Sequence, residues 1–135
     1  AYQNIHAGIY CMDWKLDSIL YVETERARQQ EINVTCKVQN YPEDQDGIQC
    51  MGKVLVKLFE YAIAENEKIH DPDKKQIDVQ INVIANQAVV LLTCPAGKKT
   101  YGLKKKINEL TKEREGNTEV EKVEGKMKIC VTFGC

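Results

Sequence analysis

The fold class of this chain follows from residues 77–93, which read IDVQINVIANQAVVLLT. Every second residue from Ile77 to Val83 is aliphatic, which is the pattern of a strand with one buried and one exposed face. Ala85-Asn86 can turn the chain, and residues 88–93 then run back as a strand buried on both faces. We therefore predict a hairpin, and with it an antiparallel sheet.

Apolar spacing predicts further elements on both sides of this hairpin. A helix is expected from Asp13 or Asp17 to about Gln30, because either carboxylate can accept hydrogen bonds from the amides of a first turn. The remaining expectations are a short strand at 9–12, a strand at 32–38, a loop at 41–47, a helix around 103–110 and a strand at 127–133. Together they predict an α+β domain in which an antiparallel sheet packs against one to three helices.

Residues 53–64 fit two patterns. Their apolar residues follow the spacing of a helical stripe, whereas every second residue between Leu55 and Ile63 can also share one face of a strand. The helix is the better fit. A helix here gives, from residue 31 onward, the strand-helix-strand-strand-helix-strand order of a ferredoxin-like split βαβ sandwich, which is the alternative fold.

Length and composition restrict the class of protein. The chain has 135 residues, 43% of them hydrophobic, and a formal net charge of −1. This length predicts one domain over residues 1–135, and the composition excludes disordered and collagen-like chains. The longest unbroken apolar run is the five residues 88–92, so no membrane span is expected.

The cysteines point to an oxidising compartment. Their even number and irregular spacing favour a disulfide framework over a zinc site, which usually needs closely spaced pairs backed by histidines. The chain begins at Ala1, as after removal of a signal peptide, and Asn33-Val34-Thr35 is a glycosylation sequon. We therefore predict a secreted protein without metal, glycosylated at Asn33, with disulfides among Cys11, Cys36, Cys50, Cys94, Cys130 and Cys135.

Residues for common enzyme chemistry are scarce. The only serine, Ser18, lies in a predicted helix with no histidine nearby, and the even cysteine count argues against a free nucleophilic thiol. Glu60 lies between two aromatic residues that can raise the pKa of its carboxyl group. No cofactor is expected.

A basic cluster lies at residues 98–114, which carry seven positive and two negative side chains. Tyr101 adds an aromatic face beside the cations, as in proteins that bind single-stranded nucleic acid, although a solvated helix face gives the same pattern. The candidate RNA- or anion-binding residues are Lys98, Lys99, Tyr101, Lys104, Lys105 and Lys106.

Several short segments between residues 9 and 104 resemble a known family in order and spacing. They are Ile9-Tyr10-Cys11, Tyr41-Pro42, residues 59–63, residues 77–82, Asn86-Gln87 and residues 89–93. In this respect the chain resembles the guanyl-specific fungal ribonucleases and, more closely, the ribonuclease-like secreted effectors of powdery mildew fungi.

This resemblance implies a site in which Glu60 matches the general base of the ribonucleases and Tyr41 is a second remnant. The family's histidines and arginine are replaced by Glu43, Asp78 and Thr93-Cys94, so phosphodiester cleavage is expected to be lost. The resemblance then implies a non-catalytic effector of a fungal pathogen that binds a host protein or RNA and that a plant immune receptor can detect.

Two other functions stay open at this point. The chain can be an active ribonuclease or other hydrolase that uses its histidines differently. It can also be a secreted, toxin-like protein with the ferredoxin-like fold. A strand at residues 54–63 favours the ribonuclease-like fold, and a helix there favours the split βαβ sandwich.

Overall fold

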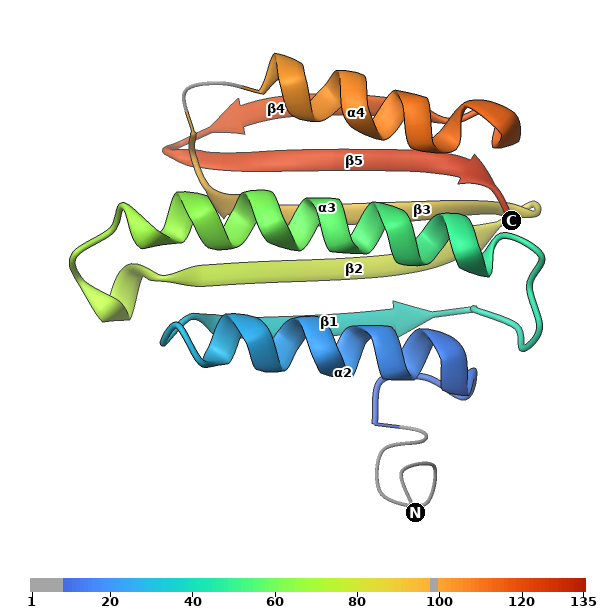
Figure 1. Cartoon of the computed structure of the whole chain (residues 1–135), viewed down its shortest axis with the longest axis horizontal. Coiled ribbons are helices and arrows are strands. Elements are labelled where there is room, and N and C mark those ends of the chain that lie inside the picture. The colour runs from blue at the N-terminus through green and yellow to red at the C-terminus, as the bar shows by residue number, and fades with distance from the viewer. Residues whose placement is uncertain (1–8, 98–99) are drawn as a thin grey trace.

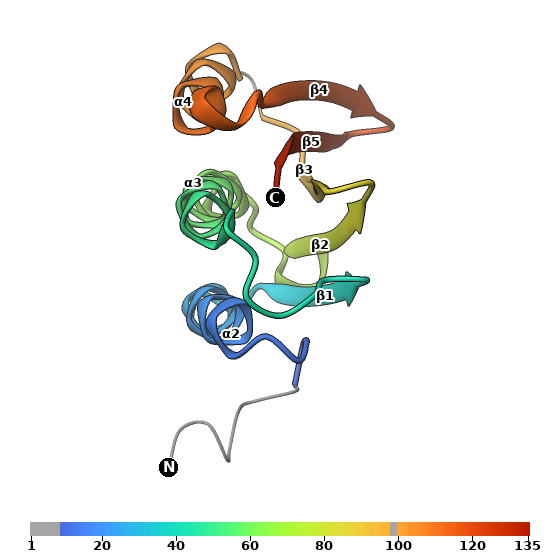
Figure 2. The ribbon, with the colours of Figure 1, turned by 90° about the vertical axis from the view of Figure 1, so that its right-hand side faces the viewer.

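A computed structural model describes residues 9–97 and 100–135, and in these residues the chain forms two layers (Figures 1 and 2). One layer is a five-stranded sheet, and the other consists of three helices that all lie on the same face of the sheet. This α+β architecture confirms the predicted fold class. The helices are α2 (Trp14–Arg28), α3 (Ile48–Glu67) and α4 (Tyr101–Thr111); the strands are β1 (Asn33–Gln39), β2 (Gln76–Ile84), β3 (Gln87–Pro95), β4 (Asn117–Val123) and β5 (Lys126–Gly134); and the short 3-10 helices are η1 (Pro72–Lys74) and η2 (Lys112–Arg114).

The order of the strands in the sheet is β1-β2-β3-β5-β4. β1 pairs with β2 in parallel and all other neighbours are antiparallel. The two parallel strands are joined through α3 and are direct neighbours, so the βαβ unit is not split. The fold therefore differs from the ferredoxin-like alternative, and it contains β4, a strand that the sequence analysis did not predict.

The hairpin at residues 77–93 is confirmed as β2 and β3. Ile81 faces Val90 across the pair, and the turn lies at Ala85 and Asn86, whose φ angles are 50° and 65°. Two successive residues with positive φ are the mark of a type I′ turn, whose twist matches that of the flanking strands. Asn86 tolerates this conformation well, while Ala85 adopts it at a steric cost.

The ambiguous residues 53–64 are helical and belong to α3. One stripe of apolar residues on α3 is completely buried against the sheet, and Val56 lies outside it on the exposed surface of the helix; the stripe includes Met51, Val54, Leu55, Leu58, Phe59 and Ala62. A strand would have turned half of this stripe toward solvent, which explains why the helical interpretation is right.

The N-terminal end of α2 explains why residues 9–12 form a bend instead of the predicted strand. The side chain of Asp13 caps the helix by accepting from the Leu16 amide at 3.0 Å. Asp17, one turn later, is buried and accepts from the amides of Tyr10 at 2.7 Å and Cys11 at 3.3 Å. These amides are therefore bonded to a helix side chain and not to a neighbouring strand.

The predicted disulfides are not present: all six cysteines lie in the described residues and each carries a free thiol. Cys94 faces the helices and Cys130 faces the opposite side of the sheet, so these two cannot meet. Burial is the main cause that raises the pKa of Cys11 to about 11 and of Cys36 to about 12. Such thiols are protonated at neutral pH and pack as small apolar side chains.

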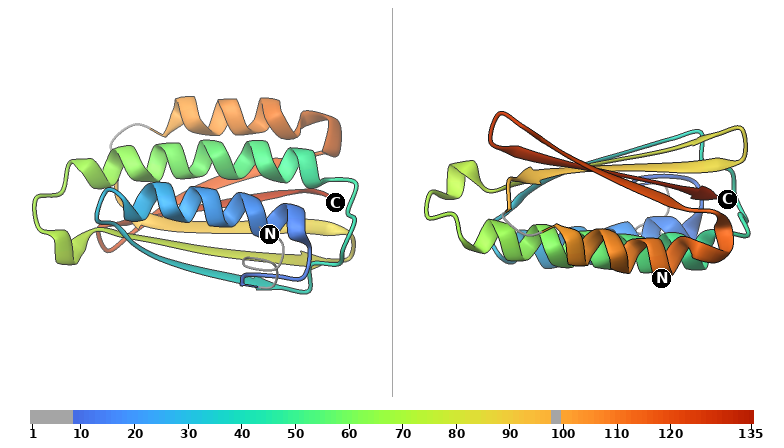
Figure 3. Two further views of the ribbon diagram at one scale, coloured as in Figure 1. Left: turned by 60° about the horizontal axis from the view of Figure 1, so that its bottom comes forward. Right: turned by 90° about the horizontal axis from the view of Figure 1, so that it is seen from above.

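The face of the sheet opposite the helices is not covered by any described residue (Figure 3). It carries polar side chains near the edges, such as Lys37 of β1 and Glu119 of β4, with partly exposed Val89 and Leu91 between them. Within residues 9–97 and 100–135, no helix has the length and the apolar character needed to cross a membrane.

Candidate functional site

The candidate site lies where β3 ends and the chain passes to α4. Gly97 lies just after the end of β3. Tyr61 and Glu65, which are one helical turn apart on α3, both lie close to it. A Cβ atom at Gly97 would lie 2.7 Å from the Glu65 carboxylate and would also overlap the Tyr61 hydroxyl. A side chain at this position would have to displace the ends of the Tyr61 and Glu65 side chains, so glycine allows the close approach of α3. We call Tyr61, Glu65, Cys94 and Gly97 the β3-end cluster.

The polar groups of this cluster are largely withdrawn from solvent. The Tyr61 hydroxyl is buried and has no hydrogen-bond partner among the described residues. The Glu65 side chain is only 11% exposed, and its carboxylate accepts from Lys68 Nζ at 3.0 Å. Burial, followed by the nearby Glu65 charge, raises the pKa of both Tyr61 and Cys94 to about 12. The phenol is consequently neutral at pH 7 and can donate a hydrogen bond to an anion.

The first half of α4 is strongly basic. Lys104, Lys105 and Lys106 are exposed, and the first turn contains no acidic residue. These lysines take part in none of the ion pairs found in the described residues. Cations near a helix N-terminus oppose the helix dipole, whereas an anion there is stabilised by it. The arrangement therefore favours an anionic ligand at this end of α4.

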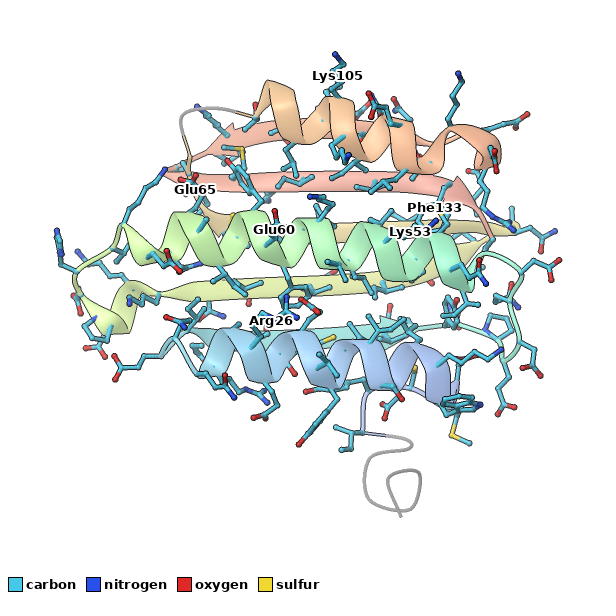
Figure 4. All side chains as sticks on the ribbon, in the orientation of Figure 1. Arg26, Lys53, Glu60, Glu65, Lys105 and Phe133 are labelled. Atoms are coloured by element: carbon cyan, nitrogen blue, oxygen red, sulfur yellow. The ribbon has the colours of Figure 1, made fainter. Side chains whose placement is uncertain are left out.

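The predicted basic residues do not all meet in one place. Figure 4 shows Glu65 at the C-terminal end of α3 and Lys105 on the side of α4 that points away from α3. Lys98 and Lys99 lie outside the described residues, as does the side chain of Tyr101. Of the predicted set, Lys104, Lys105 and Lys106 are placed by the structure, and Lys105 points away from the cluster.

A cavity of about 250 Å³ opens at the same end of the sheet, on the other side of Cys94. Two lysines, Lys74 and Lys126, and two acids, Asp78 and Glu124, are among the residues that line it. Its volume lies below the range of about 300–1,000 Å³ that is common for small-molecule pockets. Its balanced charges do not favour an anion, in contrast to the start of α4.

Tyr41 and Glu60, expected as remnants of a ribonuclease site, lie on different elements. Tyr41 is buried in the loop after β1, and burial followed by the neighbouring Cys135 raises the pKa of its hydroxyl. The Glu60 side chain is 64% exposed on α3, with Lys57 Nζ 3.5 Å from its carboxylate. Asn33 is exposed at the start of the edge strand β1. Its glycosylation and the secretion of the protein stay predictions.

Apart from Cys94, the residues of the β3-end cluster were not among the site residues predicted from the sequence. The helical interpretation of residues 53–64 places Tyr61 and Glu65 four residues apart on one face, and the end of the hairpin is followed by Gly97. These signals indicate that the three residues lie near an element junction. They do not indicate that α3 and β3 meet at this point, because this depends on the pairing of β3 with β5 and on the position of α4.

No family model matches the sequence, and no curated protein matches it. The structure is similar to that of the Acinetobacter baumannii histidine kinase AdeS, with a TM-score of 0.66 and 13% identity over 89% of this chain. The chain spans 62% of the AdeS chain. It is also similar to a nucleotide-free form of the catalytic domain of histidine kinase ThkA, with a TM-score of 0.61, 15% identity and 89% of each chain covered.

A third similar structure is that of ThkA in complex with the response regulator TrrA, with a TM-score of 0.59 and 14% identity over 89% of this chain and 39% of the ThkA chain. These similarities correct the resemblance to fungal ribonucleases and to powdery mildew effectors, which is wrong. Its segments are short and common, and it requires a strand where α3 is helical.

The same comparison overturns the expectations that followed from this resemblance. The similar structures are histidine kinases, including a catalytic domain, and not secreted effectors. A non-catalytic effector acting in plant immunity, and partners such as host proteins, RNA or immune receptors, are therefore wrong expectations; the solved complex pairs its kinase with a response regulator. At 13–15% identity the comparison establishes one thing for this chain: it has the fold of a histidine kinase catalytic domain.

Proposed function

We propose that this domain binds a nucleotide in the manner of a kinase-type catalytic domain, with the phosphates at the start of α4 and beside the β3-end cluster. The observation that carries the proposal is the junction of β3 and α4. Gly97 lies against the little-exposed carboxylate of Glu65, and α4, whose first turn contains Lys104 and no acidic residue, begins four residues later at Tyr101. The similarity to the ThkA catalytic domain, solved in a nucleotide-free form, supports a nucleotide as the anion.

The phosphate end of a nucleotide fits the residues at this junction. A helix N-terminus offers backbone N–H groups and a favourable dipole to a phosphate, and lysines act on it as point charges. Lys104 lies at the end of the first turn of α4, and the chain just before the helix reads Gly97-Lys98-Lys99-Thr100. The cost of placing these cations against the helix dipole is offset only when an anion binds.

A divalent cation fits the junction through Glu65. Among the described residues no three potential metal ligands gather in one place. Mg²⁺ bound to a nucleotide nevertheless needs only one or two carboxylates, because phosphates and waters supply its other ligands. Glu65 is the carboxylate placed to serve, since it lies against Gly97 and is little exposed. Bound Mg²⁺ would supply neutralisation of the phosphate charge during phosphoryl transfer.

Tyr61 would act as a hydrogen-bond donor in this site. Its hydroxyl is buried, neutral at pH 7 and unpaired among the described residues. A buried donor without a partner costs about 1–3 kcal/mol, and a ligand oxygen that accepts from it removes this cost. Tyr61 thus positions the ligand and does not transfer a proton.

The test is titration of the purified chain with a fluorescent ATP analogue, with Mg²⁺ and then with EDTA. We expect saturable binding that ATP displaces and that weakens as salt increases. Tyr61→Phe should weaken binding several-fold, by the loss of about 1 kcal/mol from one hydrogen bond. Glu65→Gln should reduce the difference between the affinities measured with Mg²⁺ and with EDTA, because the carboxylate proposed to bind the cation is removed.

Two substitutions on α4 form a matched pair for the phosphate contact. Lys104→Glu reverses a charge at the start of the helix and should weaken binding about tenfold. Lys112→Glu makes the same change at the other end, where Lys112 is exposed, and should leave the affinity close to that of the wild type. The absence of saturable binding, or equal losses in the two variants, would refute the proposal.

A further inference from the structure

A second feature of the helical layer is a groove on the outer surface of α3, remote from the β3-end cluster. Its volume is about 480 Å³, and it is lined by Gln49, Gly52, Lys53, Val56, Lys57 and Leu110. The first five lie at positions i, i+3, i+4, i+7 and i+8 along one side of α3, and Leu110 closes the groove from α4. Val56 is 38% exposed at the floor, so an apolar strip remains open to solvent between two helices.

The apolar strip extends from α3 onto α2. Gly52 lets the side chain of Ile19 approach closely, because a Cβ atom at this position would lie 3.2 Å from Ile19 Cδ1. Val22 lies one turn beyond Ile19 and is 50% exposed. Ile19, Val22, Gly52, Val56 and Leu110 thus form a surface that crosses the three helices, which we call the helical strip.

The charges around the helical strip are mainly positive. Lys57 and Arg26 have carboxylate partners at 3.5 Å, in Glu60 and Glu23 respectively. Lys53 and Lys15 are exposed and take part in none of the ion pairs found in the described part of the chain. Figure 4 shows Lys53 and Glu60 along α3 and Arg26 on α2.

We propose that the helical strip binds an acidic amphipathic helix of a partner protein. A helix is the occupant that matches the spacing, because its apolar residues at i, i+3, i+4 and i+7 can lie along the apolar strip between α3 and α4. Its acidic residues would face Lys53, which lines the groove, with Lys15 of α2 farther out on the same side. Unpaired cations around an apolar floor favour an acidic partner over a basic one through complementary charge.

This interaction is independent of nucleotide binding, because Lys53 and Val56 lie two to three turns from Glu65 along α3. The two proposals therefore fail separately. The experiment is carried out on the complete chain without nucleotide. A fluorescently labelled helical peptide with leucines at i, i+3, i+4 and i+7 and flanking glutamates is titrated by anisotropy, and a second peptide carries lysines in place of the glutamates.

We expect the acidic peptide to bind with at least about tenfold higher affinity than the basic peptide, and the difference to decrease as salt increases. Val56→Glu should weaken the acidic peptide about tenfold or more, since it places a charge in the floor of the groove. Lys53→Glu should weaken it several-fold. Far-UV circular dichroism of each variant confirms that the fold is retained.

The matched controls lie on the open side of the sheet. Ile84→Glu changes an aliphatic residue that is 58% exposed, and Lys37→Glu reverses an exposed charge. Both should leave the affinity for the acidic peptide unchanged. Equal binding of the two peptides, no loss in Val56→Glu, or binding of anionic lipid vesicles with no binding of the acidic peptide would overturn the proposal.

Discussion

The two helices that flank the proposed nucleotide site are stabilised in different ways. α3 buries nine residues along its length and lies over the centre of the sheet. α4 buries Ile107 and Thr111 among its described side chains, and its first half carries lysines that oppose the helix dipole. The comparison indicates that α3 supports the fold, whereas the start of α4 gives up local stability in favour of a charged surface.

The largest expected effect tests this difference in the core. Phe59→Ala removes a completely buried ring from α3 and should lower the free energy of unfolding by about 3–5 kcal/mol. Ile107→Ala in α4 removes a smaller buried side chain and should cost about 2–4 kcal/mol. Urea unfolding followed by circular dichroism measures both values. An equal or larger loss for Ile107→Ala would show that α4 supports the core as much as α3 does.

A second pair of substitutions compares two asparagines. Asn66 of α3 is buried and bonded at both ends of its amide: Nδ2 donates to Ala62 O at 2.8 Å and to Gln76 O at 3.2 Å, and Oδ1 accepts from Gln76 N at 2.9 Å. Asn108 of α4 has a buried Oδ1 without a partner among the described residues.

Asn66→Ala should therefore destabilise the protein by about 2–3 kcal/mol, because it leaves the backbone groups of Gln76 at the start of β2 unpaired. Asn108→Ala should cost less than about 1 kcal/mol, since no hydrogen bond of Oδ1 is lost. The midpoints of urea unfolding, for variants whose free energy of unfolding falls with the same slope against urea concentration, give the two losses of stability. Similar losses in both variants would mean that Asn66 does not join α3 to the sheet.

The sequence predicted well those elements whose pattern is local. The alternation at 77–83 and the turn at Ala85-Asn86 predicted the hairpin, and the apolar stripe of residues 53–64 predicted α3. β4 was missed because only Thr118 of this strand is buried, with Val120 and Val123 half-buried, and its other side chains are mostly charged. An edge strand of this kind is stabilised by pairing with β5, which is not visible in a single segment.

The candidate site was predicted less well for a similar reason. Lysines 104–106 stand out in the sequence because charge is a local property. Tyr61 and Glu65 do not, because their importance comes from contact with Gly97, 32 residues beyond Glu65. The disulfide prediction was made from the number of cysteines, which does not show the faces they occupy; Cys94 and Cys130, for example, lie on opposite sides of the sheet.

A smaller effect concerns the pH dependence of the layer formed by α2 and α3. Glu23 of α2 is 3% exposed, and burial raises its pKa above the ordinary value of 4.5; the nearby Arg26 lowers it and Glu60 adds to the rise. A carboxyl group whose pKa is higher in the folded state favours folding below the unfolded pKa, and this stability is lost as pH rises through the folded pKa.

Glu23→Gln should therefore raise stability by about 1 kcal/mol at pH 7 and have little effect below pH 4, where the wild-type side chain is also uncharged. Thermal unfolding between pH 3.5 and 7.5 measures the difference. Glu109→Gln makes the same change on the exposed surface of α4 and is the matched control for the substitution itself. A lower stability of Glu23→Gln at pH 7 would show that the ion pair with Arg26 outweighs burial.

The smallest expected effect on stability separates the two ends of α4. Lys104→Glu replaces a cation near the helix N-terminus by an anion and should raise the free energy of unfolding by about 0.3–1 kcal/mol. Lys112→Glu at the C-terminal end should lower it by a similar amount.

If the lysines at the start of α4 bind a ligand, Lys104→Glu makes the protein more stable and weakens nucleotide binding at the same time. A solvated helix face without a ligand predicts the gain in stability alone, so measuring both quantities on the same variant decides between the two interpretations of the basic cluster.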